Sequence, residues 1–71
     1  MTPTPVLFDV VALTEDLPTH GLSRGQVGTV VEKYEGGAME VEFSDGSGRT
    51  YALLALRPDQ VLVLRFAPEA A

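Results

Sequence analysis

The chain has 71 residues, of which 45% are hydrophobic and none is cysteine. A domain of this size buries only about 60% of the surface that its unfolded chain exposes, so apolar packing must stabilise it without disulfides or thiolate-bound zinc. Ten acidic residues against five basic ones give a net charge of −5. This balance argues against binding to a nucleic-acid backbone or an anionic membrane, where clustered cations supply the affinity.

The first segment of the chain, MTPTP, lacks the charged and apolar regions of a signal peptide. No apolar run in the sequence has the length of a membrane span. We therefore expect a cytoplasmic protein. Pro3 and Pro5 predict an extended segment over residues 1–5, because proline restricts its own backbone and that of the preceding residue.

A strand and a long loop follow this segment. Residues 6–13 (VLFDVVAL) are apolar and rich in valine, which predicts a strand. Residues 14–26 (TEDLPTHGLSRGQ) carry Pro18, Gly21 and Gly25, which predict a loop. A loop of this length is unusual in so small a domain and is often where function resides.

The next two predicted strands form a hairpin. Residues 27–34 (VGTVVEKY) make the second strand, in which Gly28 suggests a bulge, a bend or a close approach of another backbone. Residues 35–37 (EGG) predict a tight turn, since paired glycines readily adopt positive φ. Residues 38–43 (AMEVEF) alternate clearly, with the apolar side chains on one face and Glu40 and Glu42 on the other.

The remaining sequence predicts two more strands. Asp45-Gly46, within residues 44–48, is a strong hairpin signal. Residues 49–56 (RTYALLAL) form the fourth strand, although their alanines and leucines also suit a short helix. Residues 57–60 (RPDQ) predict a tight or 3₁₀ turn, residues 61–66 the last strand and residues 67–71 a frayed tail.

Five short strands with hairpin connections are typical of an SH3-like barrel, and a small open meander is the alternative. We therefore predict a single all-β domain over residues 6–66, an antiparallel five-stranded SH3-like barrel with a long loop after its first strand.

Several motifs together resemble a family of bacterial proteins, domain of unknown function 4926. They are DLP, HGL, Gly25, VGTVV, VEF and TYA, and the resemblance runs from about Leu7 to Leu64. The resemblance implies a small SH3-like barrel, similar in pattern to barrels of translation factors and of the nitrile-hydratase beta subunit. It implies no activity, although small acidic proteins of this kind resemble partners of other bacterial proteins, toxin-neutralising ones among them.

The long loop holds three candidate contact residues. His20 is the only histidine, and no second histidine or cysteine completes a metal or catalytic set, so it either bonds within its loop or contacts a partner. Glu15 and Asp16 are adjacent acids that are either simply solvated or meet a basic partner. We expect no catalytic group, metal or cofactor, and hence no enzyme activity.

A second acidic group lies on the predicted strands. Glu40 and Glu42 share a face, and Glu32 is placed across from them on the neighbouring strand. Like charges that face one another cost stability. Unless Arg49 or Lys33 relieves them, this face is either an ordinary polar exterior or an electrostatic docking surface.

Apolar residues occur on both faces of several predicted strands, although only one face of a small barrel is inside. The surplus at Leu7, Val11, Leu54 and Leu62 predicts an exposed apolar patch, which usually marks an interface.

The expected function is therefore a non-catalytic protein-interaction module, in one version an antitoxin, that binds another protein or itself through an acidic face and an apolar edge. One alternative is a nucleic-acid-binding barrel, which would need folding to gather Arg24, Arg49 and Arg57 into a basic stripe. The other is a non-catalytic subunit that completes an enzyme.

Overall fold

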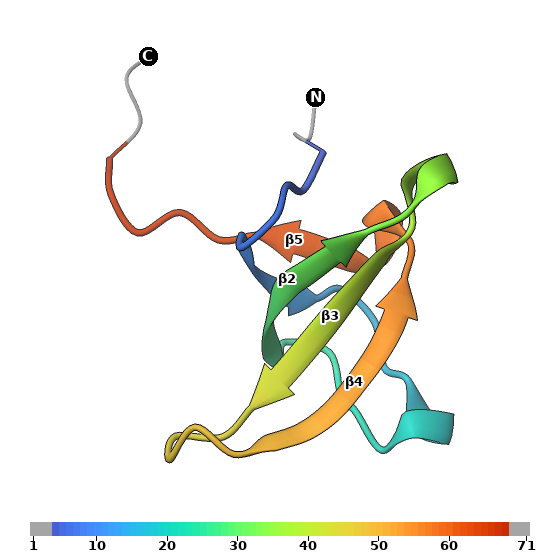
Figure 1. Ribbon diagram of the computed structural model, residues 1–71. Helices are drawn as coiled ribbons and strands as arrows, with labels where there is room; N and C mark the ends of the chain where they lie inside the picture. The colour runs from blue at the N-terminus through green and yellow to red at the C-terminus, as the bar shows by residue number, and fades with distance from the viewer. Residues whose placement is uncertain (1–3, 69–71) are drawn as a thin grey trace.

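Alternating apolar residues build one antiparallel sheet with the strand order β4-β3-β2-β1-β5 (Figure 1). The computed structural model describes residues 4–68. The strands are β1 (Val10–Leu13), β2 (Val27–Lys33), β3 (Met39–Ser44), β4 (Thr50–Leu56) and β5 (Val61–Val63). Three single 3₁₀ turns connect them, namely η1 (Pro18–His20), η2 (Glu35–Gly37) and η3 (Pro58–Gln60).

The predicted all-β class and the five antiparallel strands are confirmed. The sheet is not closed, because β4 and β5 end it on either side and no ladder joins them within residues 4–68. The SH3-like barrel therefore stays a prediction. No helix among these residues is long and apolar enough to cross a membrane. Residues 1–3 of the predicted extended segment and 69–71 of the predicted tail lie outside the described residues.

The core lies on the concave side of the curved sheet. In β3 the predicted alternation is confirmed, because Met39, Val41 and Phe43 are fully buried and alternate with the partly exposed Glu40 and Glu42. β1 and β5 alternate in the same way. The buried apolar residues are Val11, Leu13, Leu22, Val30, Met39, Val41, Phe43, Leu56, Val61 and Val63.

The first strand begins at Val10, four residues later than predicted. A turn precedes it, in which the Asp9 amide donates to the Val6 carbonyl at 3.0 Å and the Val6 amide donates to Asp9 Oδ2 at 2.9 Å. Phe8 occupies this turn with a φ of 71°. The last strand likewise ends at Val63 rather than Phe66. Apolar composition alone therefore overestimated the length of both strands.

Gly28 makes a close approach but not a bulge. Its backbone pairs regularly with Val11. A Cβ atom at this position would lie 2.7 Å from Val41 Cγ1 and 2.9 Å from the Glu42 carbonyl oxygen. The irregularity in β2 lies instead between Val30 and Glu32, where Val31 is the extra residue. The predicted close approach is thus confirmed, and the suggested bulge at Gly28 was wrong.

The turn between β3 and β4 is organised by one carboxylate. Asp45 Oδ1 accepts hydrogen bonds from the Ser47 hydroxyl at 2.7 Å, the Ser47 amide at 2.9 Å and the Arg49 amide at 3.0 Å. These donors, the Ser47 hydroxyl first, lower the pKa of Asp45 because they stabilise its charged form. The predicted hairpin is formed at this position.

The loop over residues 14–26 is folded on itself. Leu17 and Leu22 exchange backbone hydrogen bonds of 2.9 and 3.2 Å around η1. The Arg24 amide donates to Asp16 Oδ1 at 2.8 Å, and Leu22 inserts into the core. Buried Leu22 therefore anchors the loop to the sheet.

Candidate binding surface

The outward face of β2, β3 and β4 carries the predicted acidic group. Glu32 lies directly opposite Glu40, as the sequence predicted, and Glu42 lies opposite Thr29. The extra residue Val31 makes this possible, since an uninterrupted register would pair Glu32 with inward-facing Met39. On the other side of β3, Glu42 lies opposite Leu53.

Hydroxyl groups, rather than cations, contact two of these carboxylates. The Tyr34 hydroxyl donates to Glu40 Oε1 at 3.0 Å, and the Thr50 hydroxyl donates to Glu42 Oε2 at 2.7 Å. The bond to Glu40 raises the pKa of Tyr34, because it holds the phenolic proton beside a negative charge. Lys33 donates to the Pro5 carbonyl at 2.6 Å instead. Lys33 therefore does not neutralise this acidic group.

The outward face of β2, β1 and β5 is apolar. Ala12 lies between Val27 and Leu62, so these three side chains form a row across three strands. In the neighbouring row Val10 lies opposite Thr29, and the Leu64 amide donates to the Val10 carbonyl. Val27 and Leu62 are each about half exposed. We call the five residues Val10, Ala12, Val27, Leu62 and Leu64 the apolar half of the face, and Glu32, Glu40 and Glu42 its acidic half.

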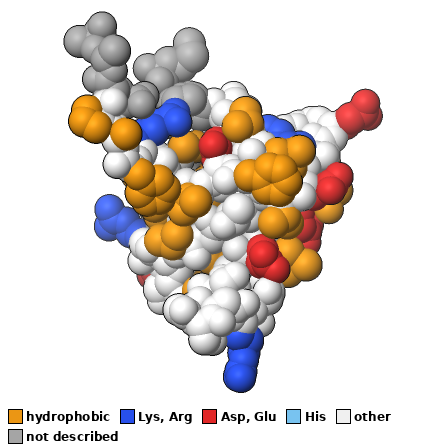
Figure 2. Space-filling view, turned by 60° about the vertical axis from the view of Figure 1, so that its left-hand side comes forward, with side chains coloured by type: hydrophobic (Ala, Val, Ile, Leu, Met, Phe, Trp, Pro, Cys, Tyr) orange, Lys and Arg blue, Asp and Glu red, His pale blue; other side chains and the backbone are white. Residues whose placement is uncertain are grey.

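Two aromatic side chains flank the end of the apolar half. Phe8 precedes β1 and is 72% exposed, and Phe66 follows β5 and is 80% exposed. Figure 2 shows hydrophobic side chains gathered over this side of the molecule, with acidic side chains along its right-hand border. A positive φ is uncommon for a bulky residue such as Phe8 and costs about 1–3 kcal/mol. The turn that holds Phe8 in this strained conformation therefore leaves its ring exposed to solvent.

Only some of the residues predicted for the exposed apolar patch are in fact exposed. Leu7 and Leu62 are exposed as expected. Val11 was wrongly included, because it faces inward on β1 and is fully buried. Leu54 was also misplaced, since it faces inward on β4 and packs against the core, while its neighbour Leu53 is 56% exposed. In TYALLAL apolar residues occupy both odd and even positions, so alternation alone does not tell the inward-facing residues from the outward-facing ones.

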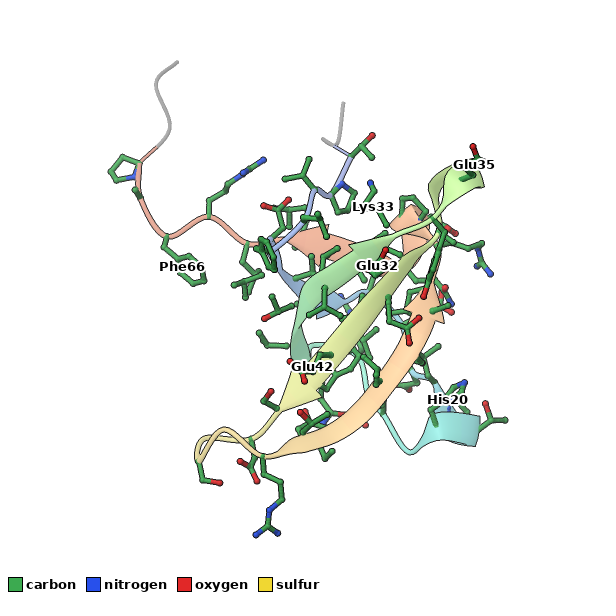
Figure 3. All side chains as sticks on the ribbon, in the orientation of Figure 1. His20, Glu32, Lys33, Glu35, Glu42 and Phe66 are labelled. Carbon is green, nitrogen blue, oxygen red and sulfur yellow. The ribbon has the colours of Figure 1, made fainter. Side chains whose placement is uncertain are left out.

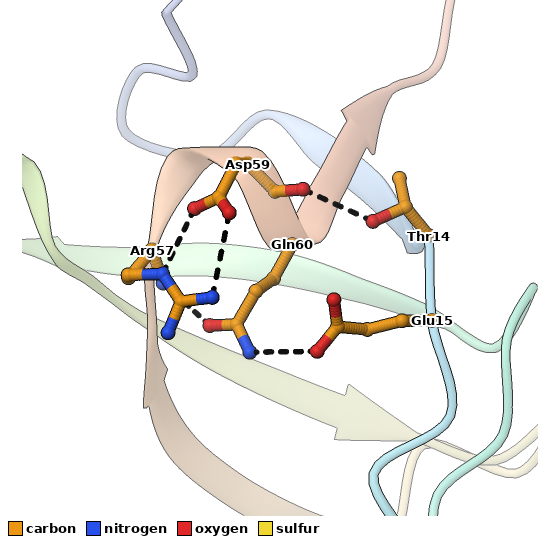
Figure 4. Close-up of polar contacts among 5 residues, drawn as sticks. All are labelled: Thr14, Glu15, Arg57, Asp59 and Gln60. Atoms are coloured by element: carbon orange, nitrogen blue, oxygen red, sulfur yellow. Dashed lines mark hydrogen bonds and ion pairs between the residues drawn. The ribbon is translucent and has the colours of Figure 1, made fainter.

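The three loop candidates lie apart from this face. Asp16 accepts the Arg24 amide, and Glu15 Oε2 accepts from Gln60 Nε2 at 3.3 Å (Figure 4), so both carboxylates hold the loop in place. His20 is exposed on η1, at the other end of the molecule from Phe66 (Figure 3). Between residues 4 and 68, no group of three or more histidines, aspartates or glutamates is arranged to hold a metal ion.

Folding does not bring Arg49 and Arg57 together, as the stripe of a nucleic-acid-binding barrel would need. Arg49 and Arg57 flank the seven residues of β4 and so lie roughly 25 Å apart along the strand. Arg57 Nε is also 3.0 Å from Asp59 Oδ1 (Figure 4). This ion pair lowers the pKa of Asp59 and raises that of Arg57.

The sequence left Phe8 open between a core position and a surface aromatic groove, and it did not identify Phe66 or Val27 as surface residues. Both phenylalanines were placed inside predicted strands, where apolar residues are expected in the core. Asp9 carried the one available signal, because an aspartate within an apolar run favours a turn.

The match to a known family covers all five strands of this sheet. A family model described as Domain of unknown function (DUF4926) matches residues 7–63. The chain belongs to this family. Comparison with curated proteins and with solved structures gave no match. Membership of DUF4926 agrees with the resemblance drawn from the sequence motifs, and the matched residues include β1 through β5.

Proposed function

We propose that this DUF4926 protein is a non-catalytic protein-interaction module that binds another protein through the outward face of its sheet. The observation that supports this is the division of one face into an apolar half and an acidic half. Interfaces commonly combine an apolar centre with a polar rim, and exposed aromatic residues are enriched in them. Strained and exposed Phe8 supplies such an anchor.

The partner's surface should match this division. An apolar patch would cover Val10, Val27 and Leu62, while lysines or arginines beside it would face Glu40 and Glu42. Charge complementarity of this kind orients the partner and raises the association rate. An antitoxin that covers a basic active site is one version, and an accessory subunit of an enzyme is another. Scattered arginines make nucleic acid a weaker candidate.

A variant series read by affinity capture tests this proposal. The tagged protein and four variants are incubated with extract of the native host, with and without nuclease, and captured proteins are quantified by mass spectrometry. Phe8→Ser and Leu62→Ser test the apolar half, and the pair Glu40→Gln with Glu42→Gln tests the acidic half. His20→Ser is the matched control, because it removes an exposed ring far from this face.

We expect one protein to be captured by the wild type and by His20→Ser, with or without nuclease. Loss of one good apolar anchor costs about 2 kcal/mol or more, which is roughly a thirtyfold decrease in affinity, so both apolar variants should lose this protein. The acidic pair should slow its association, most clearly at low salt. Equal capture by all variants, or capture that nuclease abolishes, would contradict the proposal.

A further inference from the structure

The free edge of β4 is unprotected. Seven residues, Thr50–Leu56, form this edge strand, and none of them is charged or proline. Apart from the ladder with β3, these seven residues form no backbone hydrogen bond with any residue between 4 and 68. Edge strands leave alternate N–H and C=O groups unpaired, and natural proteins usually protect them with charges, proline or covering segments.

The opposite edge of the sheet is different. β5 has only three residues and so offers few unpaired backbone groups. The chain leaves the ladder directly afterwards, with the Leu64 amide as its last bond to β1. Shortness is itself a protection against strand addition. The difference between the edges therefore identifies β4 as the place where another strand would pair.

We propose that β4 pairs with β4 of a second copy of this chain, antiparallel about a two-fold axis, to form one continuous ten-stranded sheet. Strand addition at an exposed edge is a common mode of recognition. In the central register Leu53 faces its own copy on the outward side, and Ala52 faces Leu54 on the inward side. All of these side chains are apolar, so no like charges oppose one another within Thr50–Leu56. Just outside this strand, the same register places Arg49 opposite Arg57 of the second copy, a repulsion that salt screens.

The negative charge of the acidic half is also compatible with a second copy at β4. Glu42 lies one strand inside the edge, opposite Leu53. In the dimer its carboxylate would be three strand spacings, about 14 Å, from its counterpart in the other subunit. The Debye length is about 8 Å at 0.15 M salt and about 30 Å at 0.01 M. The dimer should therefore form at physiological salt and weaken at low salt, which is opposite to association driven by charge attraction.

Analytical ultracentrifugation across a range of protein and salt concentrations tests this. The wild type should dimerise, with a smaller dissociation constant at 0.15 M than at 0.01 M salt. Leu53→Lys places two like charges at the two-fold axis and should raise that constant by about tenfold or more. The introduced lysine lies opposite Glu42 of the same subunit, and this attraction favours folding. Leu62→Lys on the apolar half is the matched control and should dimerise like the wild type.

Hydrogen exchange provides a second readout that is independent of any substitution. Amides of β4 that point away from β3 should exchange more slowly as wild-type concentration rises, while those of β5 stay unchanged. A wild type that is monomeric at all concentrations would overturn the proposal. So would a dimer that survives Leu53→Lys and is lost in Leu62→Lys, since it would use the apolar half instead. Partner capture by that face is measured separately, so the two proposals can fail independently.

Discussion

Gly28 shows how a single residue determines the packing of this sheet. The residue is buried in β2, and its missing side chain lets Val41, Glu42 and Phe43 of the neighbouring strand approach closely. Val41 is fully buried and the Glu42 carbonyl is part of the backbone of β3, so neither can move aside at little cost. Glycine is therefore required here by contact rather than by backbone conformation.

Gly28→Ala should destabilise the protein by about 1–3 kcal/mol, because the added methyl group overpacks a filled core. Urea unfolding followed by circular dichroism measures the change in the free energy of unfolding. Gly46→Ala is the control, since nothing lies within 4 Å of a Cβ at that turn position. Its effect should stay within about 0.5 kcal/mol. An equal loss in both variants would contradict the packing explanation.

At the scale of the elements, two extra residues decide which side chains face outward. Val31 in β2 brings Glu32 beside Glu40. In β4, Tyr51 is the extra residue between the pairs Phe43–Ala52 and Ser44–Thr50. Its ring then lies 6.3 Å from that of buried Phe43, and its hydroxyl accepts from Gln26 Nε2 at 3.2 Å. Each irregularity changes the face on which the following residues lie.

The opposition of Glu32 and Glu40 predicts that Glu32→Lys stabilises the protein. A repulsive cross-strand pair becomes an attractive one, which is worth about 0.2–1 kcal/mol. Denaturant unfolding at low and high salt measures the gain, which should shrink as salt screens the pair. Glu35→Lys, on the η2 turn, makes the same change in net charge away from the strands. If Glu35→Lys stabilises equally, general charge relief rather than the pair is responsible.

At the scale of the whole molecule, η3 joins the long loop to the edge strands. Gln60 is buried there, and its Oε1 accepts from the Arg57 amide at 2.9 Å while its Nε2 donates to Glu15 (Figure 4). Backbone bonds reinforce the connection, since the Thr14 amide donates to the Gln60 carbonyl at 2.9 Å. The turn therefore links the end of β4 to the start of the long loop, whereas no strand ladder joins β4 to β1 or β5 among residues 4–68.

Gln60→Leu should lower the free energy of unfolding by about 1–3 kcal/mol, because it leaves the partly buried Arg57 amide without a partner. Thermal and urea unfolding of the wild type and of Gln60→Leu measure this difference in the free energy of unfolding. Thr14→Val is the comparison, since it removes one exposed 3.1 Å bond to the Asp59 carbonyl. That change should cost about 0.5 kcal/mol. Equal losses would show that burial of Gln60 contributes nothing.

The sequence was sufficient for the strands and turns whose signals are local. The alternation in β3, the glycines of η2 and Asp45 of the next turn each depend on a few neighbouring residues, and all three predictions are confirmed. The placement of Glu32 across from Glu40 is also confirmed. The candidate surface was harder to predict, because TYALLAL and VLFDVVAL carry apolar residues at both odd and even positions, which would place them on both faces of a strand.

Amino-acid order by itself thus determined the all-β class, the number of strands and the acidic face, since period-two patterns and turn residues act over short distances. Only the tertiary structure decided that Leu53 rather than Leu54 faces outward, that Phe8 is exposed in a strained turn, and that the sheet stays open at β4. These properties depend on register and on edge pairing between distant segments, which no local pattern specifies.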